Sequence, residues 1–164
     1  MHMENLKILG FRATIDSVGG TLDKIDGIKK EGEIIQLLNA EAVASKNHIT
    51  HGVNQAILAF NRGENLAKDL SVEIVLRCSA QRQISKAFKI LGLNEGEMEL
   101  CAVLVNCDDD YTDELENIFT RDDDVLIADE SKLKEIYKIS DIELENLSVE
   151  DIIIDRITKL IADY

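Results

Sequence analysis

Two histidines are the first residues whose spacing could support chemistry. His48 and His51 form an H-x-x-H pair, which on a helix places both imidazole rings on one face. A zinc site needs further ligands and, in the metalloprotease pattern, the surrounding sequence H-E-x-x-H, which does not occur in this chain. We therefore interpret both histidines as polar residues near the start of a helix and predict no metal site.

Three cysteines and two aspartate runs are the other potential metal ligands. The cysteines are odd in number and none stands in a C-x-x-C motif, which is typical of reduced core residues. They are Cys78, Cys101 and Cys107. The aspartates at 108–110 and 122–124 lack the glycine and terminal glutamate of a calcium-binding loop in register. We expect both runs to be surface loops.

Signatures of catalysis are missing from the sequence. It contains no G-x-G-x-x-G, no G-x-x-x-x-G-K-[ST] and no G-x-S-x-G motif, so it offers no standard phosphate cradle or nucleophile elbow. We expect no cofactor and no enzymatic activity. An enzyme with an unrecognised site on the His48 and His51 face is kept as a competing hypothesis.

Charge is distributed unevenly along the chain. The net charge is −14, yet residues 46–92 carry seven basic and three acidic side chains, a local charge of +4, and residues 108–164 carry a local charge of −13. Nucleic acids are bound through lysine and arginine contacts to phosphate. A uniformly acidic protein would repel them, whereas this polarised chain can still present one basic face. The alternative is that the acidic third is simply a solvated surface.

Hydrophobic periodicity predicts strands that alternate with helices. We expect strands at 6–13, 33–38, 72–79 and 99–106, and helices at 16–30, 48–62, 84–91, near 115–119 and 133–137, and from 148 to about 162. Ser148 and Asp151 form a capping-box pattern at the start of the last helix. The pattern predicts an α/β fold, with α+β as the alternative, in which a small mixed sheet of about four strands is flanked by helices. We expect one domain, residues 1–164.

Cellular location is inferred from what the sequence lacks. No apolar run approaches the roughly 18–20 residues that span a bilayer. Residues 1–5 do not resemble the start of a signal peptide, because no basic stretch is followed by an apolar one. Together with the reduced cysteines, this predicts a cytoplasmic protein that does not contact membranes.

Motifs in the middle of the chain resemble those of a known family. Residues 62–65 read Arg-Gly-Glu-Asn and precede a segment with Glu-Ile, and residues 79–85 read Ser-Ala-Gln-Arg-Gln-Ile-Ser. The chain resembles the small regulatory subunit of the KEOPS (EKC) complex, most strongly over residues 48–106, and Ile136–Ser140 extends the likeness. The family often has Gly-Thr where this chain has Ala80-Gln81. Glycine would allow a positive φ, which alanine disfavours.

The resemblance implies a subunit without catalysis of its own. The KEOPS complex makes threonylcarbamoyladenosine in tRNAs that read codons beginning with adenosine. The family's member binds the N-terminal lobe of the small atypical kinase/ATPase subunit, and through it is linked to the threonylcarbamoyl-transferase subunit. It also captures the single-stranded CCA 3′ end of tRNA. We expect these roles here, and the alternative is a protein-only adaptor with no RNA contact.

Candidate tRNA contacts lie around the turn near residue 80. Arg82 and Lys86 are four residues apart on one face of a helix start, where free N–H groups attract phosphate, so both could flank one phosphate group. The resemblance raises the weight of this interpretation. The predicted nucleic-acid-binding residues are Arg77, on the expected strand, Arg82, Gln83, Lys86 and His51.

The last helix is the candidate surface for the kinase. Successive helical residues are about 100° apart, so three consecutive isoleucines cover an arc of about 200°, more than one core-facing stripe needs. We predict that one edge of this arc contacts the partner, with Ile154 outermost. The predicted partner-binding residues are Ile152, Ile153, Ile154 and Ile157.

Overall fold

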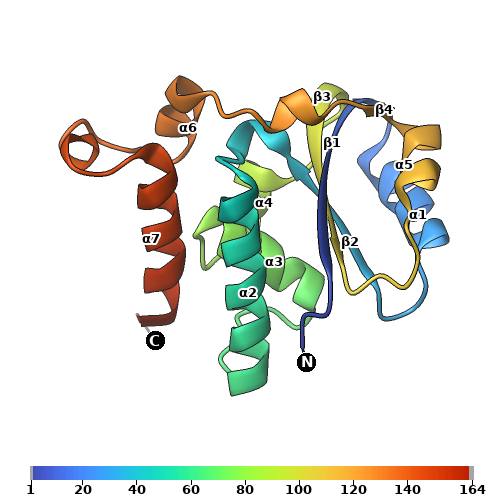
Figure 1. Ribbon diagram of the computed structural model, residues 1–164, viewed down its shortest axis with the longest axis horizontal. Coiled ribbons are helices and arrows are strands. Elements are labelled where there is room, and N and C mark those ends of the chain that lie inside the picture. The colour runs from blue at the N-terminus through green and yellow to red at the C-terminus, as the bar shows by residue number, and fades with distance from the viewer. Residues whose placement is uncertain (1, 163–164) are drawn as a thin grey trace.

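Four strands form a single antiparallel sheet between two layers of helices (Figure 1). The structure is a computed structural model that describes the backbone of residues 2–162 and the side chains of residues 2–160. The order in the sheet is β2-β3-β1-β4. The strands are β1 (Leu6–Ile15), β2 (Ile34–Asn39), β3 (Gly96–Val105) and β4 (Thr120–Arg121).

The predicted fold class is confirmed, and the direction of the strands is the first correction to the sheet. Its strands are antiparallel throughout rather than mixed. β1 and β2 run in the same direction and are joined through a helix, but β3 lies between them and runs the opposite way. This is a split βαβ arrangement, in which every pair of neighbours is antiparallel.

Helices cover both faces of the sheet (Figure 1). The α-helices are α1 (Val18–Ile28), α2 (Lys46–Arg62), α3 (Leu70–Ser79), α4 (Ile84–Leu91), α5 (Thr112–Ile118), α6 (Glu130–Ile136) and α7 (Val149–Ala162). Short 3₁₀ turns occupy Ala40–Ala42, Asp123–Leu126 and Glu143–Glu145. Side chains alternate along β1, so that Ile8 packs with α2, α3 and α7 on one face while Leu9 packs with α1 and α5 on the other.

Most predicted elements lie within a few residues of the observed ones, and their caps form as expected. Ser148 Oγ accepts a hydrogen bond from Asp151 N at 3.1 Å at the start of α7. Gly63 ends α2 with a φ of 70°, the left-handed conformation that glycine adopts without a steric penalty. The three cysteines are free and buried.

The predicted strand over 72–79 is wrong, because this segment forms helix α3. Its β-branched residues favour strands. Every residue from 73 to 79 is buried, so α3 has no solvent-exposed polar face to indicate its helical period. The overlooked signal is the spacing of Glu73 and Arg77, an i,i+4 ion pair that only a helix brings together.

Helices α2 and α3 cross at a glycine. A Cβ atom added to Gly52 would lie 2.4 Å from the Sγ atom of Cys78 and 3.1 Å from its Cα atom. Both residues are buried, and Cys78 is fully inaccessible. Because real Cβ atoms do not approach other heavy atoms so closely, a side chain at position 52 would push the two helices apart.

We therefore expect Gly52→Ala to lower the free energy of unfolding by about 1–3 kcal/mol, the usual cost of overpacking a core. The control is Gly27→Ala in α1, where an added Cβ meets nothing within 4 Å. That substitution should stabilise by about 0.5–1 kcal/mol through helix propensity. Urea unfolding followed by circular dichroism measures both, and equal effects would contradict the close crossing.

Candidate functional site

The turn between α3 and α4 exposes most of the predicted RNA contacts. Arg82, Gln83 and Lys86 are all exposed, at or next to the first turn of α4. Gln83 is the N-cap residue of α4, but its side chain makes no hydrogen bond to the first turn. The Gln83 side chain therefore does not cap the backbone N–H groups of that turn. The structure thus brings two cations and an amide together beside a helix N-terminus.

The turn itself depends on an unusual alanine. Ala80 has φ 56° and ψ 37°, a left-handed conformation, although we expected alanine to disfavour it. Hydrogen bonds compensate for the strain, because Ala80 N donates to Arg77 O at 3.0 Å and Gln81 N donates to Leu76 O at 3.1 Å. This is the pattern by which glycine usually ends a helix. The turn therefore has the geometry that a glycine usually provides at the end of a helix, with alanine in its place.

Arg77 lies in the core rather than beside this turn. Its side chain is fully buried, and its Nε donates to Glu73 Oε2 at 2.8 Å. Its Nη2 donates to the backbone oxygen of Glu64 at 3.3 Å. An arginine held in this way does not extend toward a phosphate outside the fold. The expected place of Arg77, on a strand beside the turn, is wrong because residues 72–79 belong to helix α3.

Glu73 is the structural residue that the sequence analysis overlooked. Its Oε1 accepts hydrogen bonds from Leu66 N at 2.8 Å and from Ala67 N at 2.7 Å. These bonds hold the loop that follows the Arg-Gly-Glu-Asn motif against α3. The Glu-Ile segment and the loop directly after the motif of residues 62–65 therefore lie together in space, because the Glu73 carboxylate binds the backbone of that loop.

The two histidines of the H-x-x-H pair have different environments. His48 is fully buried; its Nδ1 accepts from Ala44 N at 3.0 Å, and its Nε2 donates to Cys78 O at 2.7 Å. Both ring nitrogens are thus engaged. His51 is half-buried, and its Nε2 lies 2.7 Å from Thr158 Oγ1 on α7. It belongs to the surface between α2 and α7, so the structure does not group it with the α4 turn.

Only one of the four predicted partner-binding isoleucines reaches the surface of α7. Ile152 is 4% exposed, and Ile153 and Ile157 are fully buried against the core. They lie on the side of α7 that packs on α2 and α3. Ile154 is half-exposed, as predicted for the outermost residue, and its backbone oxygen accepts from Thr158 Oγ1 at 3.1 Å. Ile154, Thr158 and His51 thus mark one face, where α2 and α7 run side by side (Figure 1).

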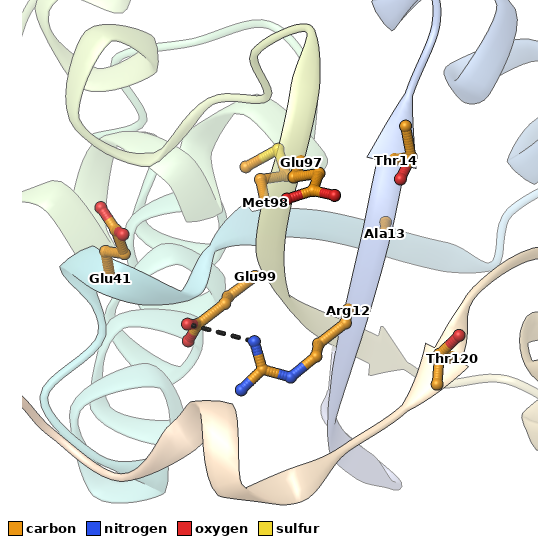
Figure 2. Close-up of a pocket in the computed structure, with 8 residues that line it drawn as sticks. All are labelled: Arg12, Ala13, Thr14, Glu41, Glu97, Met98, Glu99 and Thr120. Carbon is orange, nitrogen blue, oxygen red and sulfur yellow. Dashed lines mark ion pairs between the residues drawn. The ribbon is translucent and has the colours of Figure 1, made fainter.

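A separate hollow of about 410 Å³ lies at one end of the sheet. Figure 2 shows Arg12 reaching across it toward Glu99, with Glu97 and Glu41 nearby. Arg12 Nη1 lies 3.7 Å from Glu99 Oε1, and its Nε lies 2.7 Å from Asp122 Oδ2, which lowers the pKa of the Asp122 carboxyl. Three of the four charged side chains that line the hollow are therefore carboxylates, and the fourth, Arg12, is already paired.

Residues 2–162 contain no group of three or more histidine, cysteine or acidic side chains placed to hold a metal ion. No helix in the same residues is long and apolar enough to cross a membrane.

The fold and these surfaces define a small α+β domain with a basic turn at α4 and a two-helix face at α2 and α7. The chain belongs to the kinase-binding protein CGI-121 family, whose model matches residues 19–159. Regulatory protein Cgi121 of Methanocaldococcus jannaschii is 38% identical over 112 residues, which cover 63% of this chain and 70% of the relative. KEOPS complex subunit Cgi121 of Pyrococcus abyssi is 39% identical over 61 residues, 36% of each chain. The predicted family resemblance is confirmed.

The buried His48 makes stability depend on pH. Burial lowers the pKa of His48 from 6.5 to about 4, because the imidazolium would lose its hydration and its Nδ1 could no longer accept from Ala44 N. The unfolded chain therefore binds a proton at higher pH than the folded one. We expect up to about 3 kcal/mol of stability, fully present above pH 6.5, to be lost as the pH falls toward 4.

Urea unfolding at pH 7, 6 and 5 measures this dependence. His48→Asn is the comparison, because asparagine offers an acceptor oxygen and does not titrate in this range. It should be less stable at pH 7 but lose less stability on acidification. Parallel pH profiles for the two proteins would show that His48 does not titrate as the structure indicates.

Proposed function

We propose that this protein is a non-catalytic subunit of a KEOPS-type complex, where it binds the small atypical kinase/ATPase subunit and the CCA 3′ end of tRNA. The observation that carries the proposal is membership of a kinase-binding family over residues 19–159. The names of the two relatives, a regulatory protein and a KEOPS complex subunit, support it. In this role the protein supports threonylcarbamoyladenosine modification in the cytoplasm and performs no chemistry itself.

The α2 and α7 face is our candidate for the kinase surface. His51 and Thr158 join the two helices by a hydrogen bond of 2.7 Å. Ile154 stands beside them, and Leu58, two turns further along α2 from His51, is 38% exposed. These side chains give a mainly uncharged strip with apolar contacts, which suits a protein partner better than a phosphodiester backbone.

The α4 turn is our candidate for the tRNA end. Arg82 and Lys86 supply positive charge, and the first N–H groups of α4 supply donors for a phosphate. Single-stranded bases also need surfaces on which to stack. Ile84 and Phe88 are 51% and 39% exposed on the same helix and provide apolar area there.

The candidate tRNA site predicts an effect on RNA affinity. Arg82→Glu/Lys86→Glu should weaken tRNA binding strongly, because it replaces two attractive charges with two repulsive ones. Each lost phosphate contact should reduce the slope of log affinity against log salt by about 0.7 for a single-stranded end. Gel shifts at several salt concentrations, with tRNA that carries or lacks its CCA end, measure both effects.

The control variant has the same change in charge at two lysines far from α4 in the sequence. Lys24→Glu/Lys159→Glu, on α1 and α7, should leave the affinity much less affected. If the α4 variant binds tRNA as the unmodified protein does, the RNA site lies elsewhere. If the unmodified protein does not distinguish tRNA with and without CCA, the protein-only adaptor is the better description.

The candidate kinase surface predicts an effect on kinase binding. Ile154→Glu should abolish co-purification with the kinase subunit while the circular dichroism spectrum is unchanged, because the side chain is half-exposed and a charge there would be desolvated in the complex. Leu58→Glu should have the same effect from the neighbouring helix. Ile127→Glu, at a residue 73% exposed in the loop before α6, is the control and should bind normally. Normal binding by both surface variants would move the kinase site to another face.

A further inference from the structure

The two edges of the sheet are protected to different extents. On the β1 edge, β4 pairs with Phe11 and Arg12, and Gly10 forms hydrogen bonds with Asp122 and Asp123. At the other edge β2 pairs, within residues 2–162, with β3 alone. Proteins usually protect such an edge with charges, proline or a bulge. The sequence of β2 is Ile-Ile-Gln-Leu-Leu-Asn and contains neither a charge nor a proline.

Backbone groups of β2 point outward from this edge. Asn106 N donates to Asn5 O, so residue 106 faces β1 and, by alternation along an antiparallel strand, Val105 faces β2. The N–H and C=O groups of Ile34, paired with Val105, then face β3, and those of Ile35 and Leu37 face away from the sheet. No hydrogen bond to these outward groups occurs within the described residues.

A groove of about 390 Å³ runs along this edge, and we call it the β2 groove. Ile35 and Leu37 line its floor, and α1 and α4 contribute its walls through Leu22 and Phe88. Both wall residues are large apolar side chains that remain well exposed, at 41% and 39%. Gln36 fixes one rim, because its Nε2 donates to the backbone oxygen of Ser71 at 2.9 Å.

Electrostatics favours a peptide in this groove over a nucleic acid. The charged side chains that line it are Asp26, Lys29 and Glu33. Glu33 is buried and accepts hydrogen bonds from Tyr111 Oη, Asp108 N and Lys30 N, which hold its pKa below the usual range. The lining thus has one positive charge against two negative ones, so a phosphodiester backbone would find no net counter-charge. An uncharged main chain needs none.

We propose that the β2 groove binds an extended segment of a partner protein as an added strand. Main-chain groups of the segment pair with Ile35 and Leu37, and alternate apolar side chains contact Leu22 on one side and Phe88 on the other. The occupant is therefore a peptide with apolar residues at alternate positions. This surface is distinct from the α2 and α7 face, so the inference stands whether or not the proposed kinase site is correct.

Selection from a display library of random peptides tests the proposal with the full chain as bait. Leu22→Glu/Phe88→Glu removes both apolar walls, and Ile127→Glu/Ile142→Glu replaces two apolar residues that are 73% and 76% exposed elsewhere. Peptides enriched on the unmodified chain should show alternating apolar residues, bind the control equally well and bind the groove variant at least about tenfold more weakly. In the unmodified chain they should slow amide hydrogen exchange at Ile35 and Leu37.

A pair of N-methylated peptides tests strand addition without any change in the protein. An N-methyl group on the amides that face β2 should lower the affinity at least about tenfold, and one on the alternate amides should not. The proposal is overturned if no enriched peptide depends on the groove, if exchange at Ile35 and Leu37 is unchanged, or if both methylated peptides bind equally. If Leu22→Glu alone, which leaves Phe88 of α4 in place, loses tRNA affinity while peptide binding persists, the groove binds RNA and the proposal is also overturned.

Discussion

The close crossing of α2 and α3 is the constraint on which the rest of the helical layer depends. Gly52 allows Cys78 to approach the α2 backbone, and one turn earlier His48 donates a hydrogen bond to Cys78 O. Steric fit and a buried polar bond thus act at the same point, so α3 can neither slide along α2 nor rotate about its own axis. Because α3 ends one residue later, this crossing also sets where the left-handed Ala80 turn begins and how α4 leaves the core.

The buried ion pair of Glu73 and Arg77 complements this crossing. Desolvating two charges is costly, and further hydrogen bonds to the pair offset part of that cost. Here Glu73 Oε1 accepts from two backbone N–H groups, and Arg77 Nη2 donates to a backbone oxygen. The pair therefore serves less as an attraction between two side chains than as the means by which α3 fixes the loop that follows α2.

The local hydrophobic pattern of the sequence was sufficient to predict most helices and strands, but not the most buried ones. Amphipathic helices such as α2 and α7 could be predicted because one face is polar, whereas α3 has no polar face and its β-branched residues favoured a strand. The same error placed Arg77 on the surface. On α7 the arc of isoleucines was recognised, but only the packing of α2 and α3 decides that Ile153 is core and Ile154 is not.

Asp122 and Asp123 are polar residues whose structural role also could not be predicted from local sequence. They were expected to lie in a surface loop, yet Asp122 N donates to Gly10 O and Asp123 Oδ1 accepts from Gly10 N, each at 2.9 Å. They close the β1 edge at a residue where a Cβ would lie 2.6 Å from Asp122 O. A partner more than one hundred residues away leaves no trace in a local window of sequence, so neither the role of these aspartates nor the need for glycine could be predicted.

The sequence gives only the net charge of each segment, whereas the ion pairs show which individual charges are neutralised. Cations outside the central segment are largely matched by carboxylates of the acidic third, as in the pairs Lys7–Asp110, Arg12–Asp122, Arg121–Asp123 and Arg156–Glu143. Lys86, by contrast, has no ion-pair partner within the described residues. The acidic third thus neutralises basic side chains elsewhere and leaves Lys86, in the first turn of α4, as a positive charge that an anion can approach. The β2 groove has no such charge, so the two surfaces suit different partners: a phosphate-bearing strand at α4 and an uncharged polypeptide at β2.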